Sequence, residues 1–286
     1  MKKQNLMKAS LASLLLASPI LEASAFTVTI DAGHGYNTSG KRAVNGSFRE
    51  WEINDAVADY LQPMLESKGI TVYRLDDTTG ETDVSLNTRL QKAINYNSDL
   101  HVSIHQNAVG DEWHEATGTE TYYSVLGSQK SQDLARQVAN KMAEYIGTKN
   151  RGNKDASQSL FITREFTRAG IDANLYEGLF MSNQQDVEQM KTEEYANSYA
   201  KAIAESILST YRSEISSEPF VVRVKKDLNE TLTVRNKPHY TGEYVTEIAP
   251  GTVVTIVSVK DGWGELKSGL GYINLSSKYT EEITLN

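Results

Sequence analysis

The chain has 286 residues, of which 39% are hydrophobic, and its formal net charge is −8. This length and composition fit one or two globular domains rather than a disordered chain. The acidic balance argues against a nucleic-acid partner, because phosphate binding requires a basic surface. The lack of cysteine excludes disulfides, thiolate metal sites and cysteine nucleophiles, so any metal site must use His, Asp and Glu.

The first 25 residues show the three zones of a secretory signal peptide. A segment with three lysines, residues 2–8, precedes an apolar run at residues 11–20 that is too short to span a bilayer. Ala-Ser-Ala at residues 23–25 fits a cleavage site and would leave Phe26 as the mature N-terminus. An N-terminal core helix is the alternative. We therefore predict export to a periplasm, a cell wall or the extracellular space, with no membrane span in the mature chain.

From residue 26 to residue 212 the hydrophobic pattern alternates between strand and helix periods. The strongest helical pattern covers residues 53–65, with Gly69 as a C-terminal stop and Pro63 as a site of kinking. In chain order we expect a strand at 26–31, a helix at 53–65, a strand at 70–75, a helix at 86–94, strands at 100–105 and 119–125, a helix at 134–146, short strands at 160–163 and 173–176, and a helix at 195–211. This alternation predicts an α/β layered domain with a largely parallel central sheet flanked by helices.

The composition changes after residue 212. A polar linker at residues 213–219 leads into a region of short strands and turns, residues 220–286. Residues 253–259 are mostly β-branched, and the Asp-Gly pair at 261–262 is a hairpin-turn pattern before a return strand. We therefore predict a second domain, a small all-β barrel of a kind that binds ligands on its surface.

Two histidines and one glutamate stand where their side chains can converge. His34 follows the first strand between two glycines, which allow a sharp turn, and His105 ends another strand. Ligands of α/β sheets gather beyond the carboxyl ends of the strands, so the two imidazoles can meet there. Glu50 lies where the first helix begins, and it could complete a metal site whose fourth position is left to water.

Each of these residues alone has a plainer interpretation. A lone histidine at a strand end is more often a hydrogen-bonding or core residue than a metal ligand. We interpret His101 as a packed strand residue, His114 as part of a polar loop and His239 as part of the barrel. Because the sequence has no HExxH helix, spacing alone supports a metal site only weakly.

Four segments resemble, in order, the signature blocks of the zinc-dependent N-acetylmuramoyl-L-alanine amidases, the type-3 amidase family. They are TIDAGHG at residues 29–35, REWEIN at 49–54, SIHQN at 103–107 and YEGLFMSN at 176–183. Residues 74–77, 84–89 and 150–152 also match, so the resemblance covers about residues 27–211. Four ordered blocks are far more specific than any single motif.

The resemblance implies a zinc hydrolase of peptidoglycan. In that family two histidines and the first glutamate bind zinc, and a second glutamate is the catalytic base. The candidate site residues are His34, Glu50 and His105 as ligands of Zn²⁺, Glu177 as catalytic base, and Asn107 and Arg164 as weaker candidates for substrate contact. Zinc would activate a water and polarise the amide carbonyl, and Glu177 would carry the proton to the departing amine. For Glu177 alone, a structural carboxylate at a strand end is the alternative.

The chain departs from the family pattern at three places. Gly-Leu-Phe at residues 178–180 replaces a common Leu-Gly-Phe, Ala32 replaces a frequent proline, and Gln106 replaces the usual alanine. These departures remove no ligand or base, and they put in doubt the shape of the substrate groove. Glu52 competes with Glu50 as a ligand, but Glu52 would start a helix, where a carboxylate is stabilising in any case.

The C-terminal region resembles a bacterial SH3-like domain. Its matching segments are LTVR at 232–235 followed by Pro238, PGTVV at 250–254, GWGEL at 262–266 and GYI at 271–273. Domains of this kind often bind cell-wall peptides. Trp263 and Tyr272 could form a stacking surface for such a ligand, or both could fill a small core.

We therefore predict an exported zinc amidase with a signal peptide at 1–25, a catalytic domain at 26–212, a linker at 213–219 and an SH3-like wall-binding domain at 220–286. It would act as a monomer on peptidoglycan and hydrolyse the amide between N-acetylmuramic acid and L-alanine. One alternative is a zinc peptidase that cuts elsewhere in the stem peptide. The other is a non-catalytic wall-binding protein, which would need a missing ligand or base, whereas all of them are present.

Overall fold

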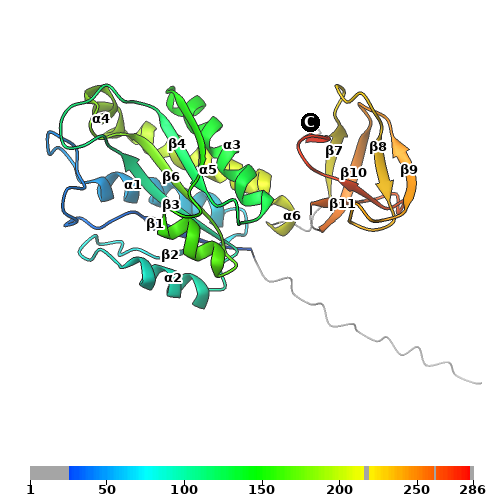
Figure 1. The fold of residues 1–286 in the computed structure, drawn as a ribbon, viewed down its shortest axis with the longest axis horizontal. Helices are drawn as coiled ribbons and strands as arrows, with labels where there is room; N and C mark the ends of the chain where they lie inside the picture. The colour runs from blue at the N-terminus through cyan, green and yellow to red at the C-terminus, as the bar shows by residue number, and fades with distance from the viewer. Residues whose placement is uncertain (1–25, 216–218, 261, 284–286) are drawn as a thin grey trace, which may run out of the picture.

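The computed structural model describes residues 26–215, 219–260 and 262–283. The predicted signal peptide, residues 1–25, lies outside these ranges, as do residues 216–218 of the predicted linker. Figure 1 shows an α/β region followed along the chain by an all-β region that begins at Phe220. Within the described ranges, no helix combines the length and the apolar composition needed to cross a bilayer.

A six-stranded sheet forms the centre of the α/β region, in the order β2-β1-β3-β6-β4-β5. Its strands are β1 (Thr27–Ala32), β2 (Thr71–Arg74), β3 (Leu100–Asn107), β4 (Thr119–Tyr123), β5 (Asn150–Asp155) and β6 (Asp172–Phe180). Strands β2, β1, β3 and β6 are parallel to one another. β4 is antiparallel to β6, and β5 is parallel to β4, so the sheet is mixed.

The direction of β4 follows from the connection that precedes it. A loop without a helix, residues 108–118, joins β3 to β4. A parallel return would need a crossover of a dozen or more residues, usually through a helix. The chain instead turns back, and β4 runs against β6. The prediction of a largely parallel sheet therefore holds for β2, β1, β3 and β6 and misses this reversal.

Helices cover both faces of the sheet (Figure 1). The helices of this part of the chain are α1 (Glu50–Glu66), α2 (Leu86–Asn95), α3 (Gln129–Ile146), α4 (Gln184–Met190), α5 (Glu193–Thr210) and α6 (Arg212–Ile215), with a π-helix η1 (Ile162–Phe166). α1, α3 and α5 pack on one face, around a core that contains Leu61 and Ile203. α2 and η1 pack on the other face, around Ala93 and Phe166.

Helix α1 shows how the sequence specifies an element of this core. Its apolar residues recur at the helical spacing, and Val57, Leu61 and Leu65 are fully buried. Complete burial of each such side chain contributes about 1.5–3 kcal/mol. Pro63 lies inside the last turn, and its carbonyl accepts a hydrogen bond from the backbone N–H of Ser67, where the helix ends. The helix begins at Glu50, three residues before the predicted range of 53–65 and at the position expected for Glu50.

Some expected elements differ from the structure. Residues 160–163, predicted as a strand, lead into η1, because a short apolar run does not separate strand from buried helix by periodicity alone. Ile162 and Phe166 are buried four positions apart, which is a helical spacing. β5 and α4 were not predicted, since neither segment carries a clear apolar alternation. β6 extends well beyond the predicted residues 173–176.

The all-β region contains a seven-stranded sheet in the order β13-β7-β10-β11-β12-β8-β9. Its strands are β7 (Phe220–Val224), β8 (Leu232–Arg235), β9 (Tyr244–Ile248), β10 (Val253–Lys260), β11 (Trp263–Leu266), β12 (Tyr272–Asn274) and β13 (Thr280–Glu282). β10 and β11 form the expected antiparallel hairpin. Trp263 is 5% exposed and packs edge-on against Tyr240, with ring centroids 5.1 Å apart. Of the two roles considered for Trp263, the structure therefore supports the buried one.

Candidate active site

The sheet brings the four candidate site residues together at the carboxyl ends of its strands. β1, β3 and β6 are adjacent and parallel, so their carboxyl ends point the same way. His34 follows β1, while His105 lies near the end of β3 and is paired in register with Glu177 of β6. Glu50 is the first residue of α1. Residues up to 143 positions apart in the chain thus meet because parallel strands share an end.

His34, Glu50 and His105 form a compact cluster. Each offers one ligand atom, and these atoms all lie within 4.8 Å of one another. His34 Nε2 is 3.5 Å from Glu50 Oε2, and His105 Nδ1 is 3.0 Å from Glu50 Oε1. The two imidazole rings stand edge-to-face at 4.9 Å between centroids. Two imidazoles and a carboxylate are a combination of ligands that also occurs in catalytic zinc sites.

The protonation of this cluster is set by burial and by the partners. Burial lowers the pKa of His34 to about 4, which keeps this imidazole neutral and able to bind a metal near neutral pH. Burial of Glu50 acts to raise its pKa, but the hydrogen bond with His105 and the charges of both histidines hold that pKa below its usual value. Burial likewise opposes the charge on His105, yet the hydrogen bond to Glu50 leaves the pKa of His105 raised. A metal ion entering the cluster would therefore compete with a proton on His105.

Three buried polar atoms of the site lack hydrogen-bond partners within the described part of the chain. They are Nε2 of His34, Oε2 of Glu50 and Oε2 of Glu177. Buried polar atoms are nearly always hydrogen-bonded, so an unpaired group needs an explanation. A cation between His34 and Glu50, with a water near Glu177, would satisfy all three. The donor set of two nitrogens and one carboxylate oxygen fits zinc better than magnesium or calcium, which prefer oxygen ligands.

The two glycines around His34 are required for space. A Cβ at Gly33 would lie 2.1 Å from Cε1 of His105, and one at Gly35 would lie 2.8 Å from the backbone nitrogen of Asp83. The left-handed backbone conformation belongs to His34 itself, with φ of 70°. The sequence interpretation assigned the sharp turn to the glycines. In the structure the histidine makes the turn and the glycines let its neighbours approach.

Arg89 of α2 holds the backbone of His34 in this conformation. Its side chain is 2% exposed, and it donates hydrogen bonds to the carbonyls of Ala32 (2.9 Å), His34 (3.1 Å) and Val84 (2.9 Å). Asp31 balances the buried guanidinium at 3.3 Å, and the charge of Arg89 helps to hold the pKa of Asp31 well below its usual range despite burial. Such residues orient the ligands without touching a metal.

Glu177 lies beside the cluster, in a buried environment. Burial raises the pKa of Glu177 from 4.5 to about 7, and the nearby charge of His105 opposes this rise. A general base works best when its pKa lies near the operating pH. The position and the pKa of Glu177 therefore both suit a group that accepts and returns a proton.

Asn107 lies next to a second charged cluster, on the other side of Glu177. Its Nδ2 donates to Glu120 at 3.1 Å, and Glu120 is the cross-strand neighbour of Glu177. Arg151 and Lys154 both bind Oε2 of Glu120, at 2.8 and 2.6 Å. These two cations share one carboxylate, which leaves an excess of positive charge near the base. The sequence did not indicate Glu120 or Lys154, because charged residues on short strands resemble surface positions.

Other residues considered from the sequence fall outside the cluster. Arg164 lies in η1 and pairs with Glu165 at 2.6 Å. It also donates a hydrogen bond to the backbone carbonyl of Gln158, which precedes η1. Glu52 accepts a hydrogen bond from the backbone N–H of Arg49 at 2.6 Å, which is the helix-start role expected for it. His101 is fully buried, stacks on Phe166 and bonds to Thr29.

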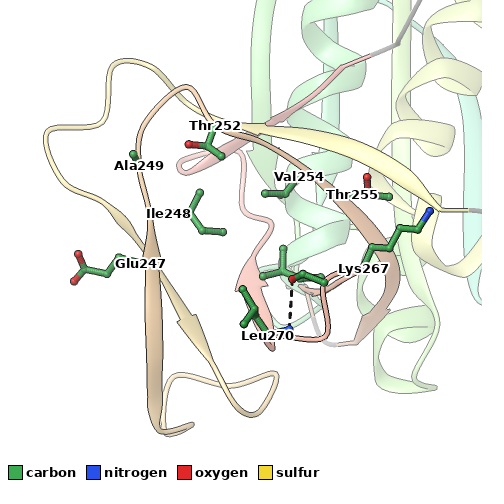
Figure 2. Close-up of a pocket in the computed structure, with 10 residues that line it drawn as sticks. Glu247, Ile248, Ala249, Thr252, Val254, Thr255, Lys267 and Leu270 are labelled. Atoms are coloured by element: carbon green, nitrogen blue, oxygen red, sulfur yellow. Dashed lines mark hydrogen bonds between the residues drawn. The ribbon is translucent and has the colours of Figure 1, made fainter.

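Two of the hollows in the described structure lie near features of functional interest, and the smaller of the two borders the candidate metal cluster through His34 and His105. It has a volume of about 280 Å³, with His34, His105 and residues 83–86 in its walls. The larger one, about 460 Å³, lies in the all-β region between β9, β10 and the β11–β12 turn (Figure 2). Its wall is mainly apolar, with Glu247 and Lys267 at its rim. The smaller hollow is the candidate active-site hollow, because two of the convergent titratable groups, His34 and His105, line it.

The sequence of this chain is similar to those of known proteins. The sequence model of a family described as N-acetylmuramoyl-L-alanine amidase matches residues 28–209. The chain is 32% identical over 187 residues to the N-acetylmuramoyl-L-alanine amidase LytC of Bacillus subtilis, a match that covers 65% of this chain and 36% of LytC. It is 30% identical over 277 residues to an endolysin of Bacillus phage SPP1, covering 88% of this chain and 96% of the endolysin.

Solved structures agree with the fold of the α/β region. The catalytic domain of CwlV, an amidase from Bacillus (Paenibacillus) polymyxa var. colistinus, superposes with a TM-score of 0.58 at 28% identity, over 65% of this chain and 98% of that domain. An N-acetylmuramoyl-L-alanine amidase from Clostridium difficile 630 gives the same TM-score of 0.58 at 30% identity, over 66% of this chain and 98% of its own.

Proposed function

The chain belongs to the N-acetylmuramoyl-L-alanine amidase family, and from this premise we propose that it is an exported, zinc-dependent amidase of peptidoglycan. The bond cleaved would be the amide between the lactyl group of N-acetylmuramic acid and L-alanine. The observation that carries the proposal is the convergence of His34, Glu50 and His105 within 4.8 Å, with Glu177 on the adjacent strand. The family match, residues 28–209, spans all four residues.

Zinc would be held by His34, Glu50 and His105. The chemistry that zinc supplies when bound is Lewis-acid activation of a water and of the amide carbonyl. The protein's part is to keep the three ligands together and in the right protonation state. Burial favours the neutral form of His34, and the two histidines favour the ionised form of Glu50. Arg89 fixes the turn that carries His34.

Glu177 would move the proton that hydrolysis requires. Its ionised carboxylate would accept a proton from the attacking water and then donate it to the departing nitrogen of L-alanine, so the carboxylate is regenerated in each cycle. Burial supports this role by raising the pKa of Glu177 toward neutrality. The positive charge of Arg151 and Lys154 beyond Glu120 lies on the same side of the sheet as the base and would suit carboxylates of the stem peptide.

The all-β region would attach the enzyme to the cell wall as an SH3-like domain. The apolar hollow with Glu247 and Lys267 at its rim offers a place for a short peptide that carries both charges (Figure 2). The match to the phage endolysin, over 88% of this chain, extends into this region and supports a function shared by both parts. The action outside the cytoplasm rests on the pattern of residues 1–25 and on the location of peptidoglycan.

Digestion of purified peptidoglycan tests the proposed reaction. With zinc present, the protein should release fragments that bear new N-terminal L-alanine, detected by amine labelling and mass spectrometry. Release of other new termini within the stem peptide would identify a peptidase instead. A protein that binds the wall without releasing any fragment would be the non-catalytic alternative. Metal analysis of the purified protein should find close to one zinc per chain.

A further inference from the structure

A continuous chain of hydrogen bonds runs behind the metal cluster, on the face of the sheet that carries α1 and α5. The backbone N–H of Leu179 donates to the hydroxyl of Tyr195 (3.1 Å), which donates to Oε1 of Gln106 (2.5 Å). Nε2 of Gln106 donates to Oδ1 of Asn54 (3.1 Å), and Nδ2 of Asn54 donates to the carbonyl of Gly33 (3.2 Å). We call these five residues the support chain.

The direction of every bond in the support chain is fixed by its two ends. The backbone N–H of Leu179 can only donate, and the carbonyl of Gly33 can only accept. The amide orientations of Asn54 and Gln106 and the direction of the Tyr195 hydroxyl follow from these ends. The three side chains are between 0% and 3% exposed, so water cannot replace a lost partner.

Four of the five residues of the support chain lie close in sequence to a residue of the candidate site. Gly33 precedes His34, Asn54 is one helical turn after Glu50, Gln106 follows His105, and Leu179 is two residues after Glu177. The backbone N–H of Gln106 also donates to Oε1 of Glu50 at 3.2 Å. The support chain thus connects the four backbone segments that carry His34, Glu50, His105 and Glu177.

Gln106 and Gly178 fit each other. A Cβ at Gly178 would lie 2.2 Å from Oε1 of Gln106 and 2.1 Å from the hydroxyl oxygen of Tyr195. The long side chain at 106 takes the space that a side chain at 178 would fill.

We propose that Gln106 is a positioning residue, which holds the three metal ligands and the base in register through the support chain. This inference rests on the proposed function of the site. Gln106 touches no reacting atom, because its side chain points to the α1–α5 face while His105 points to the opposite face. It acts through the backbones at Gly33 and Leu179 and through its own N–H on Glu50.

The test replaces Gln106 with methionine, which keeps most of the side-chain volume and removes both of its hydrogen bonds. Loss of such supporting contacts lowers metal affinity or activity by about 10- to 100-fold. Gln106→Met should therefore weaken the binding of free zinc ion and lower kcat by about that factor, with KM changed much less. Val138→Ala is the matched control, since Val138 is buried in the same core outside the support chain. It should lower thermal stability and leave zinc affinity and kcat within about twofold.

One further variant completes the test. Tyr195→Phe removes a single hydroxyl and should shift zinc affinity and kcat in the same direction, even where the methionine variant folds poorly. The inference is overturned when Gln106→Met and Tyr195→Phe match the wild type in both measurements while folded. Because the zinc titration uses no substrate, a protein that binds zinc but leaves peptidoglycan intact refutes only the proposed function.

Discussion

Substitution of Glu177 by glutamine isolates the role of this carboxylate. Gln has nearly the same shape, so the variant should fold and bind zinc through His34, Glu50 and His105. A positioned general base contributes about 10²–10⁴-fold to a rate. We therefore expect kcat on purified peptidoglycan to fall by about that factor, with the zinc content unchanged.

The same substitution has a calculable effect on stability. In the folded, metal-free protein, burial raises the pKa of Glu177 from 4.5 to about 7. The folded state then binds this proton more tightly than the unfolded state does. Stability from this group is fully present below about pH 4.5 and is lost as the pH rises through about 7. Each pKa unit corresponds to about 1.4 kcal/mol, so the loss is about 3 kcal/mol at most. The free energy of unfolding of Glu177→Gln should not decrease in this way, because glutamine does not ionise.

Urea unfolding of the metal-free proteins between pH 4.5 and pH 8 measures the effect. As the pH rises across this interval, the free energy of unfolding of the variant should increase relative to that of the wild type. Removal of an ion-paired carboxylate would have the opposite effect. Glu52→Gln serves as the control, because Glu52 caps a helix start and lies outside the cluster. Parallel stability curves for Glu177→Gln and the wild type would refute the argument from burial. Undiminished activity of the variant would exclude Glu177 as the base.

Further predictions concern the metal, its ligands and the all-β region. Removal of metal with a chelator should abolish hydrolysis, and added zinc should restore it, as followed by release of amino groups from the wall. Glu50→Gln should lose tight zinc binding, whereas Glu52→Gln should retain it within about twofold, as measured by competition with a chromogenic chelator. Gly33→Ala should weaken zinc binding at least tenfold, because its Cβ would meet the ring of His105 at 2.1 Å; binding equal to the wild type would show that the ring can move away. Leu270→Asp places a charge in the apolar wall of the larger hollow and should reduce sedimentation with purified walls, while kcat on soluble fragments stays unchanged.

The sequence predicted the location of the candidate site because of one geometric rule. His34 and His105 each end a β-branched run, and parallel strands present their carboxyl ends at one edge. The helix beginning at Glu50 was likewise visible in the local pattern. The reversed direction of β4 was not, since it depends on a loop too short for a crossover rather than on residues within the strand. Glu120 pairs with Glu177 across β4 and β6, and this pairing between strands was likewise not visible in the local pattern.

Local patterns also could not separate buried from exposed aromatic positions in the all-β region. Trp263 lies on β11 and Tyr272 on β12, and on each strand a shift of one residue in register would move the side chain to the other face of the sheet. The structure buries Trp263 against Tyr240 and leaves the open hollow to aliphatic residues such as Ile248 and Leu270. The choice of face is made by pairing across strands, which a single strand does not encode.

The departures from the family pattern acquire a physical meaning from the two faces of the strands. Adjacent residues of a strand point to opposite faces. His105 and Glu177 therefore face the candidate site, whereas Gln106 and Gly178 face the core behind it. The sequence suggested that the changes at 106 and 178 alter the substrate groove. The structure places them in the core behind the ligands, where one side chain replaces another in the same space. An exchange at such positions can retune the spacing of the ligands while every reacting group stays in place, and this is why zinc affinity reports on Gln106 more directly than substrate preference does.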